Sequence, residues 1–195
     1  MSLFPAVTAR DHQQGATDAP VTLTEYGDYE CPHCARAHPV VQELQRRFGA
    51  HLRFVFRHFP LSQAHPHAVH AAEAAECVAA HGGEAAFWRM HDALFAHAQE
   101  SSTSLSDVRL AEYAMIAGVA ADLVLHDLHT GAHEPRVRED VVSGDRSGVR
   151  GTPTFFVNGR RYDGDWTDVD VFAAVLGRAA KAVKRAARPG ATPAV

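Results

Sequence analysis

Residues 21–34 read VTLTEYGDYECPHC, a strand pattern followed by a turn and by two cysteines that are separated by two residues. Positions 21–26 alternate and are rich in β-branched and aromatic residues, which is typical of a β-strand. Pro32 suits the first position of a helix, because its missing N–H has no intrahelical partner there. Residues 32–48 place their apolar side chains on one helical face, and Gly49 ends the helix. The stretch therefore predicts a strand–turn–helix unit with both cysteines at the start of the helix.

The elements that follow predict a parallel strand, a run of helices and a hairpin. Residues 52–59 form a second strand, so the first unit is β–α–β, with a right-handed crossover. Residues 154–157 and 160–162 form two strands around Asn158-Gly159, a strong hairpin signal. The other predicted helices cover residues 66–80, 84–99, 106–117, a short stretch from 122, 134–144 and 167–187.

This order predicts the α/β class, with a thioredoxin-like core that a helical insertion interrupts. The β-α-β half and the β-β-α half form the core from residues 1–62 and 148–195, and the insertion covers residues 63–147. Residues 1–20 are expected to be irregular, and the tail after residue 187 contains Pro and Gly and is expected to fray.

The composition is that of an ordinary globular protein. Of the 195 residues, 46% are hydrophobic and 22% charged, which excludes a disordered or fibrous chain. The net charge of −4 argues against a nucleic-acid partner, which usually requires a basic face. No apolar stretch is long enough to predict a membrane span. The first 20 residues hold no apolar segment of secretory length, so we expect a cytoplasmic location, with a periplasmic or secreted form that has lost a signal as the alternative.

Cys31-Pro32-His33-Cys34 is the candidate redox centre. A thiolate at a helix N-terminus faces free N–H groups and the positive end of the helix dipole, so its pKa falls. We expect Cys31 to be the exposed attacking thiol and Cys34, one turn later, to be its buried partner. His33 is expected to place positive charge near Cys31. The alternative is half of a zinc site, which requires two further ligands from elsewhere.

Two more positions are candidates beside the cysteines. Pro153 enters a strand, so it is a candidate cis-proline, and Thr152 before it is expected to hydrogen-bond a substrate backbone. The alternative is a trans proline at the start of a strand. Glu25 lies on the buried face of a strand, where it can take and return the proton of Cys34. An ion pair between Glu25 and Arg57 is an alternative that is compatible with this role.

The chain resembles the DsbA family of thiol–disulfide oxidoreductases over nearly all of residues 12–175. The resemblance is carried by APVTLTEYGDYECPHC, LRFVFRHFPL, HPHAVHAAEAAEC, FWRMHDALF and GVRGTPTFFVNGRRYDG. It implies that Cys31 is the nucleophile, Cys34 its buried partner and Pro153 the cis-proline. It also implies a buried glutamate at Glu25 and a neighbouring cation at Arg57. The chain differs from a periplasmic DsbA in lacking a secretion signal and in having a third cysteine, Cys77.

The resemblance also implies the partners and the redox group. Protein or peptide thiols and disulfides are the expected substrates, together with a redox partner that recycles the protein, and the only redox group is the Cys31–Cys34 disulfide, with no cofactor. The rival hypothesis is a non-catalytic metal-binding or holdase-type module.

No metal site is predicted from the remaining cysteine and the histidines. Cys77 lies in an Ala-rich helical stretch, which favours a buried and inert thiol. Two loose groups of histidines are interpreted as polar residues because no carboxylate or cysteine stands beside them at a suitable spacing in the sequence. These groups are His65, His67 and His70, and His126, His129 and His133.

Overall fold

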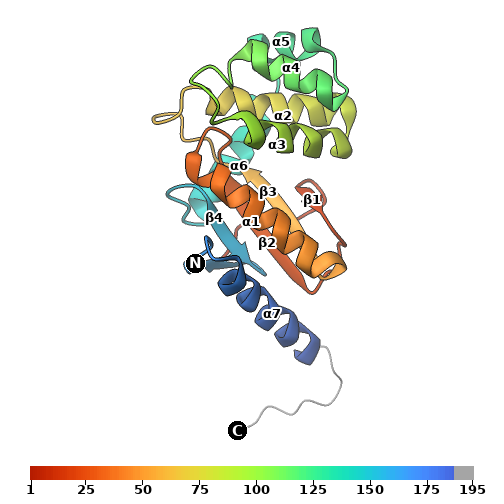
Figure 1. Cartoon of the computed structure of the whole chain (residues 1–195), viewed down its shortest axis with the longest axis vertical. Helices are drawn as coiled ribbons and strands as arrows, with labels where there is room; N and C mark the ends of the chain where they lie inside the picture. Colours follow the sequence, from red (N-terminus) through yellow and green to blue (C-terminus); the bar gives the residue numbers. More distant parts are fainter. Residues whose placement is uncertain (187–195) are drawn as a thin grey trace.

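A five-stranded mixed sheet forms the centre of the computed structural model, which describes residues 1–186 (Figure 1). The strands are β1 (His12–Gln14), β2 (Val21–Gly27), β3 (Leu52–His58), β4 (Thr154–Val157) and β5 (Arg160–Tyr162). Their order across the sheet is β1-β3-β2-β4-β5. Only β2 and β3 run parallel, and the other three pairs are antiparallel. The predicted β–α–β unit and the predicted hairpin are therefore confirmed.

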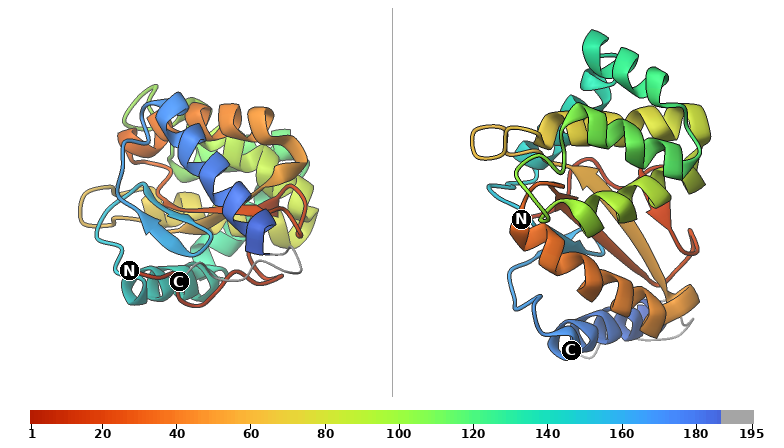
Figure 2. Two further views of the ribbon diagram at one scale, coloured as in Figure 1. Left: turned by 90° about the horizontal axis from the view of Figure 1, so that it is seen from below. Right: turned by 45° about the horizontal axis from the view of Figure 1, so that its top comes forward.

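Helices cover both faces of this sheet and extend beyond one end of it. They are α1 (Pro32–Phe48), α2 (Ala68–Gly82), α3 (Glu84–His97), α4 (Asp107–Ala117), α5 (Ala121–Thr130), α6 (Glu134–Arg146) and α7 (Val169–Ala186). Figure 2 shows α1 and α7 on one face and α6 on the other. Helices α2 to α5 stack at one end of the sheet (Figure 1). The insertion thus separates the two halves of the core in sequence but not in space, where β2 pairs directly with β4. None of the helices within residues 1–186 combines the length and hydrophobicity that crossing a membrane requires.

The alternation of side chains along the strands separates two apolar layers. Leu23, Phe54 and Phe155 point to the face that α1 and α7 cover and belong to the larger core cluster. Tyr26 and Phe156 point to the opposite face and pack in a smaller cluster. Burying each of these side chains contributes about 1.5–3 kcal/mol. Because successive residues of a strand face opposite sides, the register decides which polar side chains can meet inside the protein.

The N-terminal segment departs from the prediction. Residues 1–20 were expected to be irregular, but His12–Gln14 forms the edge strand β1, which pairs antiparallel with β3. Its polar sequence, HQQ, carries no strand signal, and tertiary contacts decide its conformation. The predicted fraying tail, and the part of the core assigned to residues 187–195, lie outside the described residues.

Helix α2 begins two residues later than predicted. The preceding segment is held by the turn before α1, since the Asp28 carboxylate accepts the backbone N–H of Leu61 at 2.8 Å. The Glu30 carboxylate accepts the backbone N–H of His67 at 2.7 Å. Residues 61–67 are therefore held by hydrogen bonds to the turn before α1 and do not belong to α2.

Candidate active site

Cys31 and Cys34 stand at the N-terminus of α1, as the sequence predicts. Cys31 is the N-cap residue, with φ −72° and ψ 121°, and Pro32 is the first helical residue. The Cys31 carbonyl accepts the first helical hydrogen bond, from the N–H of Ala35 at 3.0 Å. The two cysteines are not joined by a disulfide in this structure, so the contacts described below are those of free thiols.

Cys31 is far less exposed than predicted. Its exposed fraction is 3%, against 0% for Cys34, and both residues belong to the larger core cluster. The Cys31 sulfur also lies against the chain before β4, 3.5 Å from the Thr152 carbonyl oxygen, to which its protonated form donates. The expectation of an openly exposed attacking thiol is thus wrong. The exposed residues of the motif are the two between the cysteines, Pro32 and His33.

The surroundings of Cys31 make its thiol acidic. A hydrogen bond from the Cys34 thiol is the largest cause, burial opposes it, and the Thr152 hydroxyl and the backbone N–H groups of Cys34 and His33 add to it. Together they lower the pKa of Cys31 from 9.0 to about 5. The Thr152 hydroxyl is buried and has no hydrogen-bond partner of normal geometry in the part of the chain described, so it is free to turn toward the sulfur. At neutral pH Cys31 is accordingly a thiolate.

Cys34 and Glu25 have the opposite character. Burial, the hydrogen bond to Cys31 and the charge of Glu25 raise the pKa of Cys34 well above its usual value. Burial and the charge of the Cys31 thiolate raise the pKa of Glu25 from 4.5 to about 8. Glu25 is 2% exposed, and its Oε1 has no hydrogen-bond partner within residues 1–186. At neutral pH the Glu25 carboxyl and the Cys34 thiol are therefore protonated, whereas Cys31 is a thiolate.

The strand register brings Thr152 and Pro153 to the cysteines. Tyr26 pairs with Thr154, so the chain before β4 continues past the end of β2, where the turn into α1 begins. The Thr152–Pro153 peptide bond is cis. Residues that are 121 positions apart, Cys31 and Thr152, are thus in contact.

Asp28 was missed by the sequence analysis, although it organises the turn before Cys31. Its Oδ1 accepts the backbone N–H of Glu30 at 2.8 Å, which is an Asx-turn. Its Oδ2 lies 2.7 Å from Nδ1 of His65, and its backbone N–H donates to the Cys34 sulfur at 3.5 Å. An aspartate directly after a strand and three residues before a helical N-cap is the sequence signal that could have indicated this residue.

Arg57 does not neighbour Glu25, and that prediction is wrong. The register pairs Glu25 with Phe56, so Arg57 faces the opposite side of the sheet. There its Nε donates to Asp11 Oδ1 at 2.7 Å and its Nη1 donates to the Tyr26 hydroxyl at 2.9 Å. The buried carboxyl beneath Cys34 has no ion pair with this arginine.

The ring of His33 contacts Arg36 rather than the redox cysteines. Its Nδ1 lies 2.6 Å from Nη2 of Arg36, and the side chain is exposed. The group of His33 that reaches Cys31 is its backbone N–H. The expected electrostatic role of the imidazole therefore has no support in this geometry.

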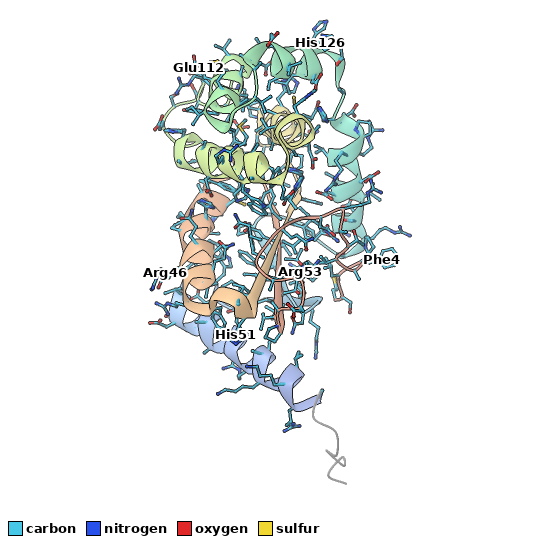
Figure 3. All side chains as sticks on the ribbon, turned by 90° about the vertical axis from the view of Figure 1, so that its right-hand side faces the viewer. Phe4, Arg46, His51, Arg53, Glu112 and His126 are labelled. Atoms are coloured by element: carbon cyan, nitrogen blue, oxygen red, sulfur yellow. The ribbon has the colours of Figure 1, made fainter. Side chains whose placement is uncertain are left out.

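The two predicted groups of histidines do not form as groups. His65, His67 and His70 each pair with a different acidic residue, namely Asp28, Glu30 and Asp107. His126 projects from the outer edge of the insertion (Figure 3) and, like His129, is exposed.

Cys77 and His133, in contrast, lie together with an acidic residue. The interpretation that no carboxylate or cysteine accompanies the histidines is wrong for His133, because the fold brings it to Asp127 and Cys77. Cys77 is buried as expected, and burial and Asp127 raise its pKa from 9.0 to about 12. It is accordingly a poor nucleophile.

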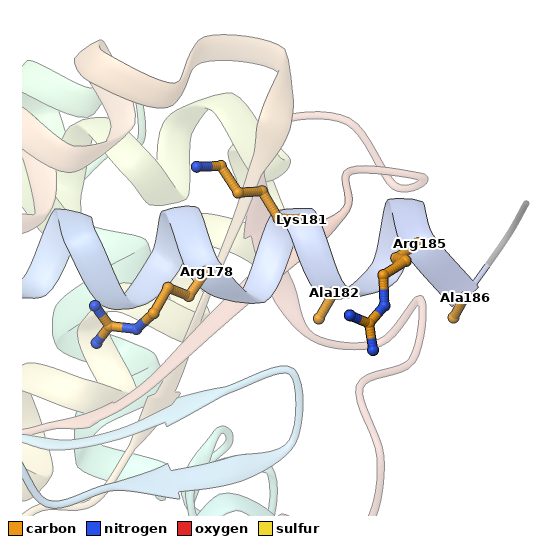
Figure 4. Close-up of a pocket in the computed structure, with 5 residues that line it drawn as sticks. All are labelled: Arg178, Lys181, Ala182, Arg185 and Ala186. Atoms are coloured by element: carbon orange, nitrogen blue, oxygen red, sulfur yellow. The ribbon is translucent and has the colours of Figure 1, made fainter. Parts of the chain in front are cut away.

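A separate hollow of about 500 Å³ lies on the outer surface of α7. Arg178, Lys181 and Arg185 line it together with two alanines, and all of these residues come from this one helix (Figure 4). It contains none of the redox residues.

The chain matches known proteins along most of its length. A family model described as Thioredoxin matches residues 8–175. A curated relative, Na(+)/H(+) antiporter NhaA 1 of Salinispora arenicola, is 45% identical over 173 residues, which are 89% of this chain and 25% of the relative. The chain spans about a quarter of the length of the curated relatives it matches.

Two solved structures have the same fold. Oxidised BdbD from Bacillus subtilis superposes with a TM-score of 0.80 at 23% identity, covering 88% of this chain and 93% of BdbD. The alpha-DsbA1 protein of Wolbachia pipientis superposes with a TM-score of 0.78 at 19% identity, covering 93% of this chain and 96% of that protein. These similarities confirm the predicted thioredoxin-like core with a helical insertion, arranged as in DsbA.

Proposed function

Because the chain belongs to the thioredoxin family, we propose that it is a thiol–disulfide oxidoreductase that exchanges disulfides with protein or peptide substrates. The observation that carries the proposal is the contrast between two thiols in one turn of helix. Cys31 has a pKa of about 5, whereas burial and its partners raise the pKa of Cys34 well above its usual value. A stable thiolate beside a protonated partner is the arrangement that a reversible disulfide requires.

The exchange proceeds in two balanced steps. A substrate thiolate attacks the Cys31 sulfur of the Cys31–Cys34 disulfide; the bond to Cys34 breaks, and the Cys34 sulfur leaves with the electron pair and takes a proton. The second substrate thiolate then attacks the substrate sulfur of the mixed disulfide, and Cys31 leaves as a thiolate. The substrate is oxidised by two electrons and the protein is reduced by two. Glu25, whose pKa is raised by its burial, supplies the proton that Cys34 takes.

The stabilised thiolate favours the oxidising direction. A thiolate exists only in the reduced form, so every contact that lowers the pKa of Cys31 also stabilises the reduced protein and makes its disulfide a stronger oxidant. Thr152 contributes a hydroxyl to this effect, and its chain segment before β4 offers backbone groups for an extended substrate. A redox partner that re-oxidises the dithiol completes the cycle.

Two single-cysteine variants test the proposal. Each is mixed in its reduced state with a peptide that carries an activated disulfide, and the products are identified by mass spectrometry after digestion. Cys34→Ser should accumulate a mixed disulfide at Cys31, since the resolving thiol is gone. Cys31→Ser should form no comparable adduct at Cys34, which is buried and protonated. Equal adducts in both variants, or none in either, would contradict the assigned roles and favour a non-catalytic module.

The antiporter activity named for the curated relatives is not proposed for this chain, which spans only about a quarter of their length. The cytoplasmic location also stays a proposal, and fractionation of cells that produce the protein tests it. The location matters because the glutathione poise of the compartment sets whether the dithiol or the disulfide is the resting form.

A further inference from the structure

Four side chains of the helical insertion converge on one point that the redox mechanism does not use. They are Cys77 and His81 of α2, Asp127 of α5, and His133, the N-cap residue of α6. Each offers one metal-ligating atom, and these four atoms all lie within 4.8 Å of one another. From this convergence we propose that the insertion holds a zinc ion, bound by the Cys77 sulfur, one nitrogen each of His81 and His133, and one oxygen of Asp127.

The contacts centre on a single oxygen atom. Oδ2 of Asp127 lies 3.3 Å from the Cys77 sulfur, 3.1 Å from Nε2 of His81 and 2.9 Å from Nε2 of His133. In a tetrahedral zinc site with bonds of about 2.0–2.3 Å, neighbouring ligand atoms are about 3.3–3.7 Å apart. The three distances from Oδ2 are equal to this spacing or shorter by a few tenths of an ångström, and the other pairs of ligand atoms lie within 4.8 Å, so side-chain shifts alone would set the four atoms around one ion.

Local structure explains why these residues meet. Cys77 and His81 are four residues apart on one helix, so their side chains project from the same face. Helix α5 ends at Thr130. Its C-cap residue, Gly131, has φ +66°, and the chain reverses there. The N–H of Ala132 donates to the Asp127 carbonyl at 3.0 Å and tightens this reversal. This reversal places the His133 side chain next to the carboxylate of Asp127, six residues earlier in the chain.

The donor set selects the metal. One thiolate, two imidazoles and one carboxylate suit zinc, whereas calcium and magnesium prefer six or more oxygen ligands. Four protein ligands leave no open position, which is the pattern of a structural site rather than a catalytic one. The ion would tie α2 to α5 and to the start of α6, two consecutive helices that α3 and α4 separate from α2 in the chain.

The site can be reached from solvent while its sulfur is shielded. The side chains of His81, Asp127 and His133 are 38%, 15% and 18% exposed, whereas Cys77 is buried. Within residues 1–186, two other sets of such groups come together: His12, His58 and Glu76, and His38, His91 and Asp92. Neither contains a thiol, so neither matches the preference of zinc as well.

The test uses the full chain with the redox cysteines removed, so that zinc at the CPHC motif cannot confuse the result. The Cys31→Ser/Cys34→Ser protein is stripped with a chelator, incubated with zinc and dialysed, and its metal content is measured. We expect about one zinc per chain. We also expect the melting temperature to rise by roughly 5–10 °C at free zinc 100-fold above the dissociation constant. Cobalt(II) alone, added to the stripped protein, should give the absorption bands of tetrahedral coordination with a thiolate ligand.

Ligand variants and matched controls decide the assignment. Adding Cys77→Ser or His133→Gln should abolish stoichiometric zinc and the cobalt bands, with the helical circular dichroism retained. His126→Gln and His129→Gln alter exposed histidines of the same helical region and should change neither readout. Absence of stoichiometric zinc in the parent, or full zinc content in both ligand variants, would overturn the proposal. Because the redox cysteines are absent throughout, these results are independent of the exchange activity.

Discussion

Replacing Glu25 by glutamine should stabilise the reduced protein at alkaline pH. The carboxyl is buried, and its Oε1 has no hydrogen-bond partner among the described residues. Burial and the charge of the Cys31 thiolate raise the pKa of Glu25 from 4.5 to about 8, so ionisation of this group opposes folding. Glutamine keeps the shape of the side chain without the charge.

The sign and size of the effect follow from proton linkage. Below about pH 4.5 the carboxyl is neutral in the folded and the unfolded chain, so the two proteins should differ little. Between pH 4.5 and about 8 only the unfolded chain ionises, and the free energy of unfolding of the parent falls relative to that of the variant. Above about pH 8 the difference reaches about 5 kcal/mol, because each tenfold change in the proton equilibrium is worth 1.36 kcal/mol. This is an upper value, since the glutamine amide also loses water on burial.

Urea denaturation at about pH 4, 6.5 and 9, with reductant present, measures the difference directly. The gap between Glu25→Gln and the parent should widen from acid to alkaline pH. Glu139→Gln is the matched control, because it removes an exposed carboxyl outside the site, and its gap should not widen in this way. A gap for Glu25→Gln that is constant across the three pH values would refute the assignment of a buried, protonated carboxyl.

Two further predictions concern histidines. Burial opposes protonation of His12, but its contacts with Glu76 and Glu84 raise its pKa from 6.5 to about 9, so the stabilisation is complete below pH 6.5 and is lost as the pH rises through about 9. His12→Gln should therefore lower the free energy of unfolding by up to about 3 kcal/mol at pH 6 and by much less at pH 10, and a loss that is equal at both would argue for packing instead. His33→Ala should leave the pKa of Cys31 nearly unchanged in an ultraviolet titration of the thiolate, because the backbone N–H remains. A clear rise in that pKa would show that the imidazole turns toward the sulfur in solution.

Local signals in the sequence were sufficient for most of the fold. The strand before Cys31, the proline at the first position of α1 and the Asn158-Gly159 turn each specify their structure within a few residues. Strand β1 was not predicted because its three polar residues carry no strand pattern. They form a strand only because they pair with β3. The propensity of a segment is informative where it is strong and is overridden by tertiary contacts where it is weak.

The site could be predicted only as far as its residues are close in sequence. The family resemblance placed Arg57 beside Glu25. In the structure Glu25 pairs with Phe56, and Arg57 is the next residue of β3, so the side chains of Glu25 and Arg57 point to opposite faces of the sheet. In the same way, the i, i+4 pair of Cys77 and His81 is visible in the sequence, but Asp127 joins it only through the packing of α5 on α2. Spacing along the chain does not reveal such contacts.

The acidity of Cys31 shows why the fold tolerates a large insertion between the two halves of its site. The pKa of this thiol depends on Cys34, on the helix N-terminus and on Thr152, which lies beyond the insertion. Pairing of β2 with β4 places Thr152, since the chain that precedes Thr154, the partner of Tyr26, continues directly to the start of α1. Helices α2 to α5 take no part in that ladder, so their length and sequence can change while the distance between the Cys31 sulfur and the Thr152 carbonyl is maintained. The chemistry of the thiol is thus set by the start of α1 and by the pairing of β2 with β4, and the insertion is free to acquire a binding site of its own.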